Sequence, residues 1–167
     1  GLTNLINSRK FVAAVSYHSG GKGLYTPSLL PTEKEGERLL ITSFTTDIQQ
    51  ANPNLNVKPL SRNTKSREIV WLKHQRGIPA FAYDYPAQIA PMEDSSREAS
   101  RLKAKQFTQS FWNSLEQRAV VMGVVVDQQN QPIRAEIRLE TDSKIDHVWE
   151  TLDNGQFALI FPSKDIF

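Results

Sequence analysis

Two short apolar segments each lead to a residue that can bind a metal ion or transfer a proton. The run from Phe11 to Val15 leads to His18, and the run Ile78–Tyr83 leads directly to Asp84. Open α/β enzymes assemble their sites at the carboxyl ends of strands, so these positions predict a shared site. Imidazole and carboxylate groups bind zinc and transfer protons, which makes metal-dependent hydrolysis the leading hypothesis. The expected geometry has both side chains facing each other across one cleft floor.

The composition limits the classes of function. The chain has 167 residues and 39% hydrophobic content, enough for one ordinary domain, or a larger piece with a small one. Lysine plus arginine (20) nearly balances aspartate plus glutamate (18), without a basic block, so no nucleic-acid partner is predicted. No apolar stretch approaches the roughly twenty residues of a membrane span. The absence of cysteine excludes disulfides and thiolate ligands and leaves the compartment open, so any metal must use His, Asp and Glu.

Residues 1–118 alternate helical and strand-like patterns. A short helix precedes the apolar run at Phe11, which predicts a strand buried on both faces, and Ile78–Tyr83 predicts a second buried strand. The pattern of 66–75 is ambiguous. Two helices are predicted after capping boxes at 32–35 and 95–98, with Asn52-Pro53 ending the first and the second ending near Arg118. Their apolar faces contain, in order, Leu40, Phe44, Ile48 and Ala51, then Ala104, Phe107, Phe111 and Leu115.

Residues 119–167 have an all-β pattern. Two strand-like runs surround a polar turn between 120 and 139, which predicts a hairpin with one solvated face. A further run over 149–161 contains Asn154-Gly155 at a predicted tight turn. The expected domains are therefore 1–118 and 119–167, and the second is short for a sandwich that must bury two sheets.

The order of these features resembles two adjacent parts of a known family. Ser16-Tyr-His18-Ser19, followed by a loop, a helix, the strand that ends at Asp84 and a closing helix, resembles the C-terminal half of a zinc metallocarboxypeptidase of the carboxypeptidase A/B type. The tail resembles the transthyretin-like, or carboxypeptidase regulatory-like, β-sandwich that follows the catalytic domain in one branch of that family. The implied fold is α/β: a partial carboxypeptidase-like mixed sheet with flanking helices, plus a small all-β sandwich, possibly incomplete. The residues that carry the second resemblance are Gly123-Val-Val-Val-Asp127, Pro132, Ala135-Glu-Ile-Arg-Leu139, Thr151 and Asn154-Gly155-Gln-Phe157.

The resemblance implies a function and assigns residues to it. His18 would be the third zinc ligand, Ser19 would lie at the mouth of the substrate pocket, and Asp84 would be the general base. Zinc-activated water would remove C-terminal residues from a peptide substrate, or cleave a related amide. The other two family ligands form a His-x-x-Glu pair, and no such pair precedes His18, so a missing N-terminal half is expected to complete the site.

Two further departures affect the expected chemistry. Aspartate replaces the family's glutamate at position 84, which shortens the reach by one methylene, about an ångström, and such a displacement can cost on the order of a hundredfold in rate. Arg62 lies near the position where the family has a tyrosine that closes over the substrate. An arginine there would favour an acidic or carboxylate-bearing group on the substrate.

Other interpretations of these residues remain open. His18 can be a hydrogen-bonded structural residue, and Asp84 can be a turn former before Tyr85-Pro86. His147 and Glu150 also match His-x-x-Glu, but residues three apart on a strand point to opposite faces, which indicates surface positions. The chain can also be a catalytically inactive carboxypeptidase-like protein that binds partners through its β domain. A third alternative is an independent α/β–β module without a metal.

Overall fold

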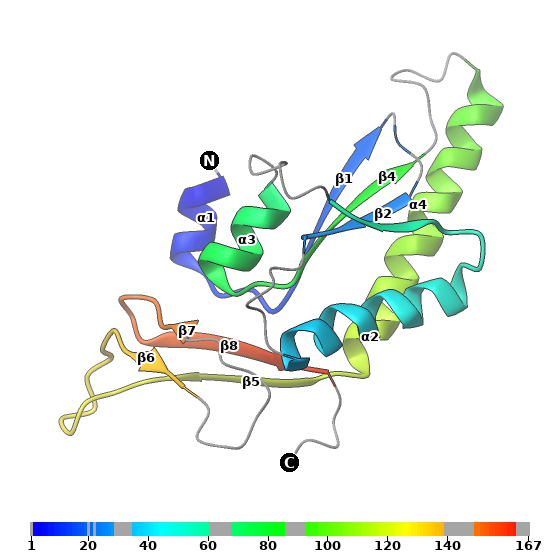
Figure 1. Cartoon of the computed structure of the whole chain (residues 1–167). Helices are drawn as coiled ribbons and strands as arrows, with labels where there is room; N and C mark the ends of the chain where they lie inside the picture. Colours follow the sequence, from blue (N-terminus) through cyan, green and yellow to red (C-terminus); the bar gives the residue numbers. More distant parts are fainter. Residues whose placement is uncertain are drawn as a thin grey trace.

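Helices cover both faces of a four-stranded sheet, and a β-rich region lies at one end of it (Figure 1). The computed structural model describes residues 2–19, 21, 23–28, 35–60, 68–85, 93–138 and 149–162. In chain order its elements are α1 (Leu2–Ser8), β1 (Ala14–Ser19), β2 (Gly23–Thr26), α2 (Glu35–Ala51), β3 (Val57–Pro59), α3 (Glu68–Arg76), β4 (Ala80–Tyr85), α4 (Asp94–Glu116), β5 (Ala119–Val124), β6 (Glu136–Ile137), β7 (Trp149–Glu150) and β8 (Gln156–Phe161).

The main sheet is mixed, with the strand order β1-β4-β2-β3. β1 runs parallel to β4, whereas β2 is antiparallel to β4 and parallel to β3. This confirms the predicted mixed α/β sheet with flanking helices. The prediction that the run Phe11–Val15 forms a strand buried on both faces was wrong, because β1 begins only at Ala14 and residues 11–16 are only partly buried. None of the described helices is long and apolar enough to cross a membrane.

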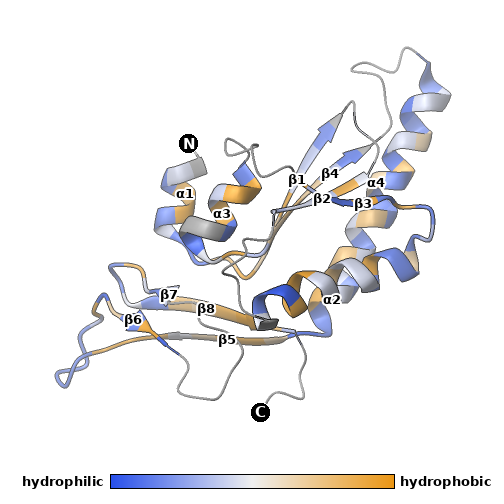
Figure 2. Ribbon diagram, viewed as in Figure 1, coloured by the Kyte–Doolittle hydropathy of each residue, from blue (hydrophilic) through white to orange (hydrophobic). Residues whose placement is uncertain are grey.

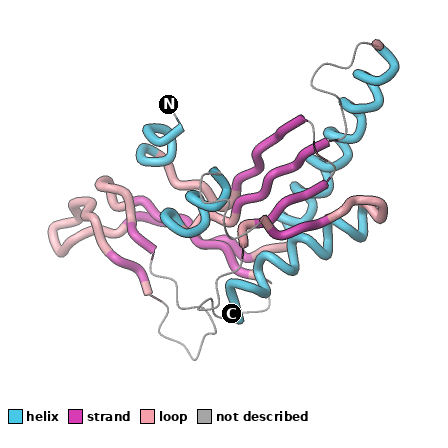
Figure 3. The backbone as a smooth tube through the Cα atoms, turned by 45° about the horizontal axis from the view of Figure 1, so that its top comes forward, coloured by secondary structure: helices cyan, strands magenta, loops and turns pink. Residues whose placement is uncertain are grey.

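Side chains alternate between the two faces of the sheet, so each helical layer packs on its own hydrophobic core. Helices α2 and α4 cover one face and α1 and α3 cover the other, in both views of the backbone (Figures 1 and 3). The first core contains Leu24, Ile41, Phe44, Ile48, Phe81, Tyr83, Phe107, Phe111 and Ile160. The second contains Ile6, Leu60, Ile69, Leu72, Ile78, Ala80 and Ala82. Phe81 and Tyr83 of β4 therefore point to the α2/α4 face, and Ala80 and Ala82 point to the α1/α3 face.

The predicted apolar helix faces are largely confirmed, and two details were wrong. Ala51 at the end of α2 is exposed. Helix α4 begins at Asp94 after Glu93, whose side chain makes no cap hydrogen bond, so the predicted cap Ser95 lies inside the helix. The first predicted capping box begins outside the described residues. The ambiguous stretch forms α3, which ends where Gly77 adopts a left-handed conformation with φ of 62°.

The β-rich region differs from the predicted hairpin. β5 pairs with β8 in antiparallel register, and β6 pairs with β7. Between the two predicted hairpin arms, the described residues form only an isolated bridge at Val126 and Pro132, because β5 takes the more distant β8 as its partner. The predicted tight turn is confirmed, since Gly155 has a φ of 73° and Leu152 N–H donates to the carbonyl of Gln156. The described residues form two two-stranded sheets, and a sandwich is not confirmed.

The β5–β8 sheet is continuous with the α2/α4 core. Ile160 of β8 belongs to that core, and Figure 2 shows that hydrophobic residues dominate both strands. At the junction, the buried Arg118 lies between α4 and β5 and forms an ion pair with Asp47 of α2. Lys10, which follows α1, donates from Nζ to the carbonyl of Glu150 in β7. Burial, followed by the charge of Arg76, lowers the pKa of Lys10.

Candidate functional site

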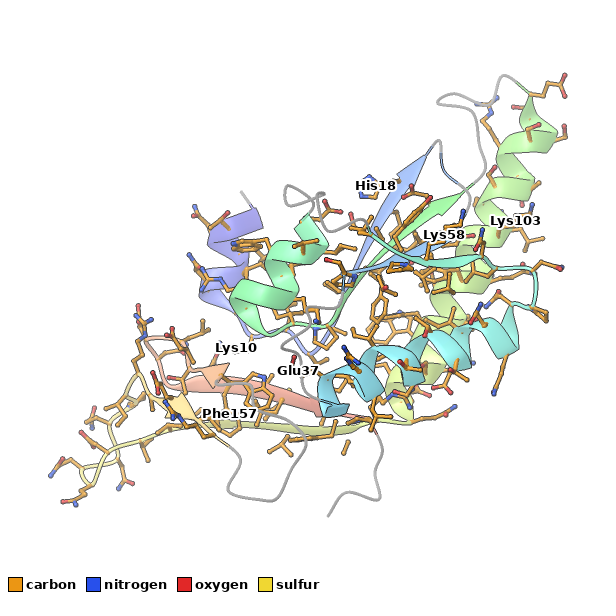
Figure 4. All side chains as sticks on the ribbon, in the orientation of Figure 1. Lys10, His18, Glu37, Lys58, Lys103 and Phe157 are labelled. Carbon is orange, nitrogen blue, oxygen red and sulfur yellow. The ribbon has the colours of Figure 1, made fainter. Side chains whose placement is uncertain are left out.

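The structure places His18 and Asp84 on neighbouring parallel strands in direct register. Residues that pair in register point to the same face, and here it is the face of Ala80 and Ala82, covered by α1 and α3. The arrowheads of β1 and β4 point away from the β5–β8 sheet (Figure 1), and His18 lies far from the labelled Lys10 and Phe157 in Figure 4. The candidate site therefore lies at the carboxyl ends of the parallel strands, as the sequence predicts.

The Asp84 side chain is buried beneath the backbone of Gly21. It is 6% exposed, and a methyl group on Gly21 would lie 2.3 Å from its Oδ2 and 2.4 Å from its Cβ. Real Cβ atoms do not approach other heavy atoms this closely, so the position requires the hydrogen of glycine. Gly21 thus covers the carboxylate directly, and water or substrate must reach it from another side.

His18 uses one ring nitrogen for both of its side-chain hydrogen bonds among the described residues. Its Nε2 lies 2.8 Å from Oε1 of Glu68 and 2.9 Å from Oγ of Ser16. A serine-hydrolase relay needs the serine and the carboxylate on different ring nitrogens, so this arrangement is not such a relay. Instead, the serine and the carboxylate hold the same edge of the imidazole.

Glu68 is the residue that the sequence interpretation missed. It begins α3, in the stretch where the pattern was ambiguous, and Ile69 and Leu72 anchor that helix in the core. A helix start also favours a carboxylate. His18 and Glu68 are fifty residues apart, so no local motif links them. The one sequence signal that could indicate Glu68 is the assignment of 66–75 to a helix.

Two opposing effects set the pKa of Glu68. Desolvation raises the pKa, whereas hydrogen bonds with His18 and Ser16 and a bond with the backbone lower it by more, so the pKa lies below its usual value. Glu68 therefore stabilises the folded chain above its unfolded-state pKa of about 4.3, and this contribution disappears as the pH falls through the lower folded-state pKa.

We expect Glu68→Gln to lower the free energy of unfolding by about 1 kcal/mol at pH 7, because it replaces a charge-assisted hydrogen bond by a neutral one. The difference from the unaltered chain should shrink toward zero as the pH falls through the lowered folded-state pKa of Glu68. Urea denaturation of both proteins at several pH values measures it. A difference that stays constant over this range would contradict the assignment.

The remaining predicted site residues are only partly described. Ser19 ends β1 and pairs with Tyr85, but its side chain lies outside the described residues. Arg62 and His147 also lie outside the described residues, so their positions relative to the site stay untested. Within the described part of the chain, no group of three or more His, Asp or Glu side chains could hold a metal ion. His18 is therefore at most one ligand of a site that needs others.

Comparisons with known proteins add one finding about the fold. No protein-family model matches the sequence, and no curated protein matches it by sequence. A solved structure that is similar is the crystal structure of a metallo-carboxypeptidase from Burkholderia cenocepacia, with a TM-score of 0.50 and 13% identity. The match covers 69% of this chain and 33% of that one. This similarity shows a carboxypeptidase-like fold, and the match spans about a third of the neighbour's length.

Proposed function

We propose that this chain forms part of a zinc-dependent, metallocarboxypeptidase-like hydrolase that removes C-terminal residues from peptides or cleaves a related amide. The observation that carries the proposal is the register of His18 with Asp84 on adjacent parallel strands, on one face and at their carboxyl ends. The carboxypeptidase-like fold also supports the proposal.

His18 fits the role of a zinc ligand. Metal-binding histidines usually donate the N–H of their other ring nitrogen to a carboxylate, and Glu68 accepts from Nε2 at 2.8 Å. Zinc, when bound, would lower the pKa of a water molecule and polarise the peptide carbonyl. The remaining zinc ligands would lie in polypeptide beyond the described residues, as the resemblance implies. Residues 119–167 would form a transthyretin-like domain.

Asp84 would accept a proton as the general base, and Ser19 and Arg62 would contact the substrate. Gly21 covers one side of the Asp84 carboxylate, so the proton would have to reach it from another side. A salt bridge between Arg62 and a carboxylate on the substrate would select acidic groups.

The burial of Asp84 favours a second candidate function. A 6% exposed carboxylate can serve to hold the loop after β1, and the chain would then belong to an inactive carboxypeptidase-like binding protein. Its binding surface would be the β domain, where Met122 is 70% exposed and Val124 is also exposed.

Zinc-dependent peptide hydrolysis separates the two candidates. The assay uses the full-length natural protein, peptides with free or blocked C-termini, and the variants His18→Ala and Asp84→Asn. We expect His18→Ala to lose both bound zinc and hydrolysis, and Asp84→Asn to retain zinc and lose hydrolysis. His147→Ala is the matched control and should change neither. Turnover that survives both site variants would reject the proposal, and zinc binding without any turnover would favour the inactive protein.

A further inference from the structure

The contacts of His18 determine which of its ring nitrogens is available to a ligand. Both side-chain partners described for His18, Ser16 and Glu68, meet it at Nε2. A carboxylate at neutral pH accepts hydrogen bonds and cannot donate them. At 2.8 Å from Glu68, Nε2 must therefore carry the proton, because two lone pairs at that distance would repel each other. In the neutral ring, Nδ1 is then the nitrogen with the free lone pair.

Ser16 is compatible with this proton position. Its hydroxyl interacts with both Nε2 and Glu68, and a hydroxyl can accept from one group while it donates to another. Ser16 and His18 are two residues apart on β1 and therefore lie on the same face, while Glu68 approaches from α3. The imidazole is thus held from its own strand and from the covering helix.

The geometry points to Glu68 as a positioning residue that fixes the proton of His18 on Nε2 and so presents Nδ1 as the metal-binding atom. This inference rests on the proposed function for the metal, whereas the position of the proton does not depend on it. Glu68 suits the role because α3 is fixed in the core by Ile69 and Leu72, so its first residue has a defined place.

The proton position can be measured directly in this chain. Nuclear magnetic resonance of protein labelled with ¹⁵N in its three histidines reports which nitrogen of each ring is protonated, and His18→Gln assigns the signals. We expect His18 to show a protonated Nε2 with an N–H signal that is protected from exchange with water and shifted downfield by the carboxylate. Its Nδ1 should be unprotonated.

Substitutions of Glu68 and Ser16 test which group is responsible. In Glu68→Ala the protected signal should vanish through exchange, whereas in Glu68→Gln, which keeps a carbonyl acceptor, it should persist with a smaller downfield shift. Ser16→Ala is the matched control and should retain the signal. If Glu68→Ala does not fold, the difference in the Nε2–H chemical shift between the unaltered chain and Glu68→Gln still tests the role of Glu68. Protonation at Nδ1, or a signal that is unchanged in both Glu68 variants, would overturn the inference.

Addition of Zn²⁺ alone to the full-length natural protein, labelled in the same way, separates this inference from the proposed function. We expect Nδ1 of His18 to respond while the Nε2 proton remains. Loss of the Nε2 proton to zinc would overturn the inference and leave the proposed metal site intact. No response of His18 at millimolar zinc, with the Glu68-dependent signal present, would support the positioning role and count against His18 as a zinc ligand.

Discussion

Replacing Asp47 by alanine is expected to lower the free energy of unfolding by about 3 kcal/mol, because it leaves a buried arginine without its counter-charge. The Arg118 side chain is 5% exposed, and its guanidinium forms an ion pair with Asp47, whose own side chain is 25% exposed. Ser114 donates to the same carboxylate oxygen at 2.9 Å. The partial exposure of Asp47 admits some water, which places the expected cost at the lower end for broken buried pairs.

Arg118→Met should lower the free energy of unfolding by much less than Asp47→Ala. Arg118 lies 4.9 Å from the ring centroid of Phe44, so methionine at this position keeps an apolar contact. Its Nε finds no hydrogen-bond partner among the described residues, and methionine removes that unsatisfied donor as well. We therefore expect the double variant Asp47→Ala/Arg118→Met to be more stable than Asp47→Ala alone.

Urea denaturation of the four proteins in this double-mutant cycle measures the coupling. Asp94→Ala is the matched control, because Asp94 also pairs with an arginine on a helix, but both side chains are largely exposed. Exposed pairs contribute little, so that substitution should change stability by less than about 0.5 kcal/mol. Equal losses for Asp47→Ala and Asp94→Ala would show that burial of Arg118 does not determine the effect.

The sequence predicts α1, α2, α4 and the two strands β1 and β4, because each has a periodic or continuous apolar pattern. It does not predict the short strands β2 and β3, and it leaves α3 ambiguous. The faces of α2 and α4 and the strand that leads to Asp84 all follow from apolar spacing. Register is also partly accessible, since two parallel strands that end in chemical groups bring those groups to one edge. The position of His18 next to Asp84 follows from this rule.

What the sequence does not predict depends on partners that are distant along the chain. Glu68 meets His18 across fifty positions, and β5 pairs with β8 although a closer polar turn suggests a local hairpin. The pattern of alternating residues is equally satisfied by either partner strand, so only the three-dimensional packing decides between them. The packing of Gly21 against Asp84 likewise cannot be predicted from the sequence, because glycine occurs in loops for many different structural reasons.

Gly21→Ala is expected to destabilise the chain by about 2 kcal/mol through overpacking against Asp84. The new methyl group would lie within 3 Å of Oδ2, Cβ and Cγ of Asp84. The far end of a flexible side chain can move away from a new methyl group, but Cβ of Asp84 is attached to the backbone of β4. Either the backbone at residue 21 or the strand must therefore shift. Gly123→Ala is the matched control, because the nearest atoms to its methyl group, at 2.9 Å, belong to the ring edge of the partly exposed Phe157, a side chain that can turn aside.

The same contact gives a physical reason for aspartate at position 84. A glutamate would place one more methylene in a space that the backbone of Gly21 already closes. We therefore expect Asp84→Glu to be destabilising as well, by about 1 to 3 kcal/mol, although it restores the residue implied by the resemblance. In an Asp84→Gly background, which removes the side chain beneath residue 21, Gly21→Ala should lose most of its cost. Denaturation curves that show the same cost for Gly21→Ala in both backgrounds would place the strain elsewhere in the loop.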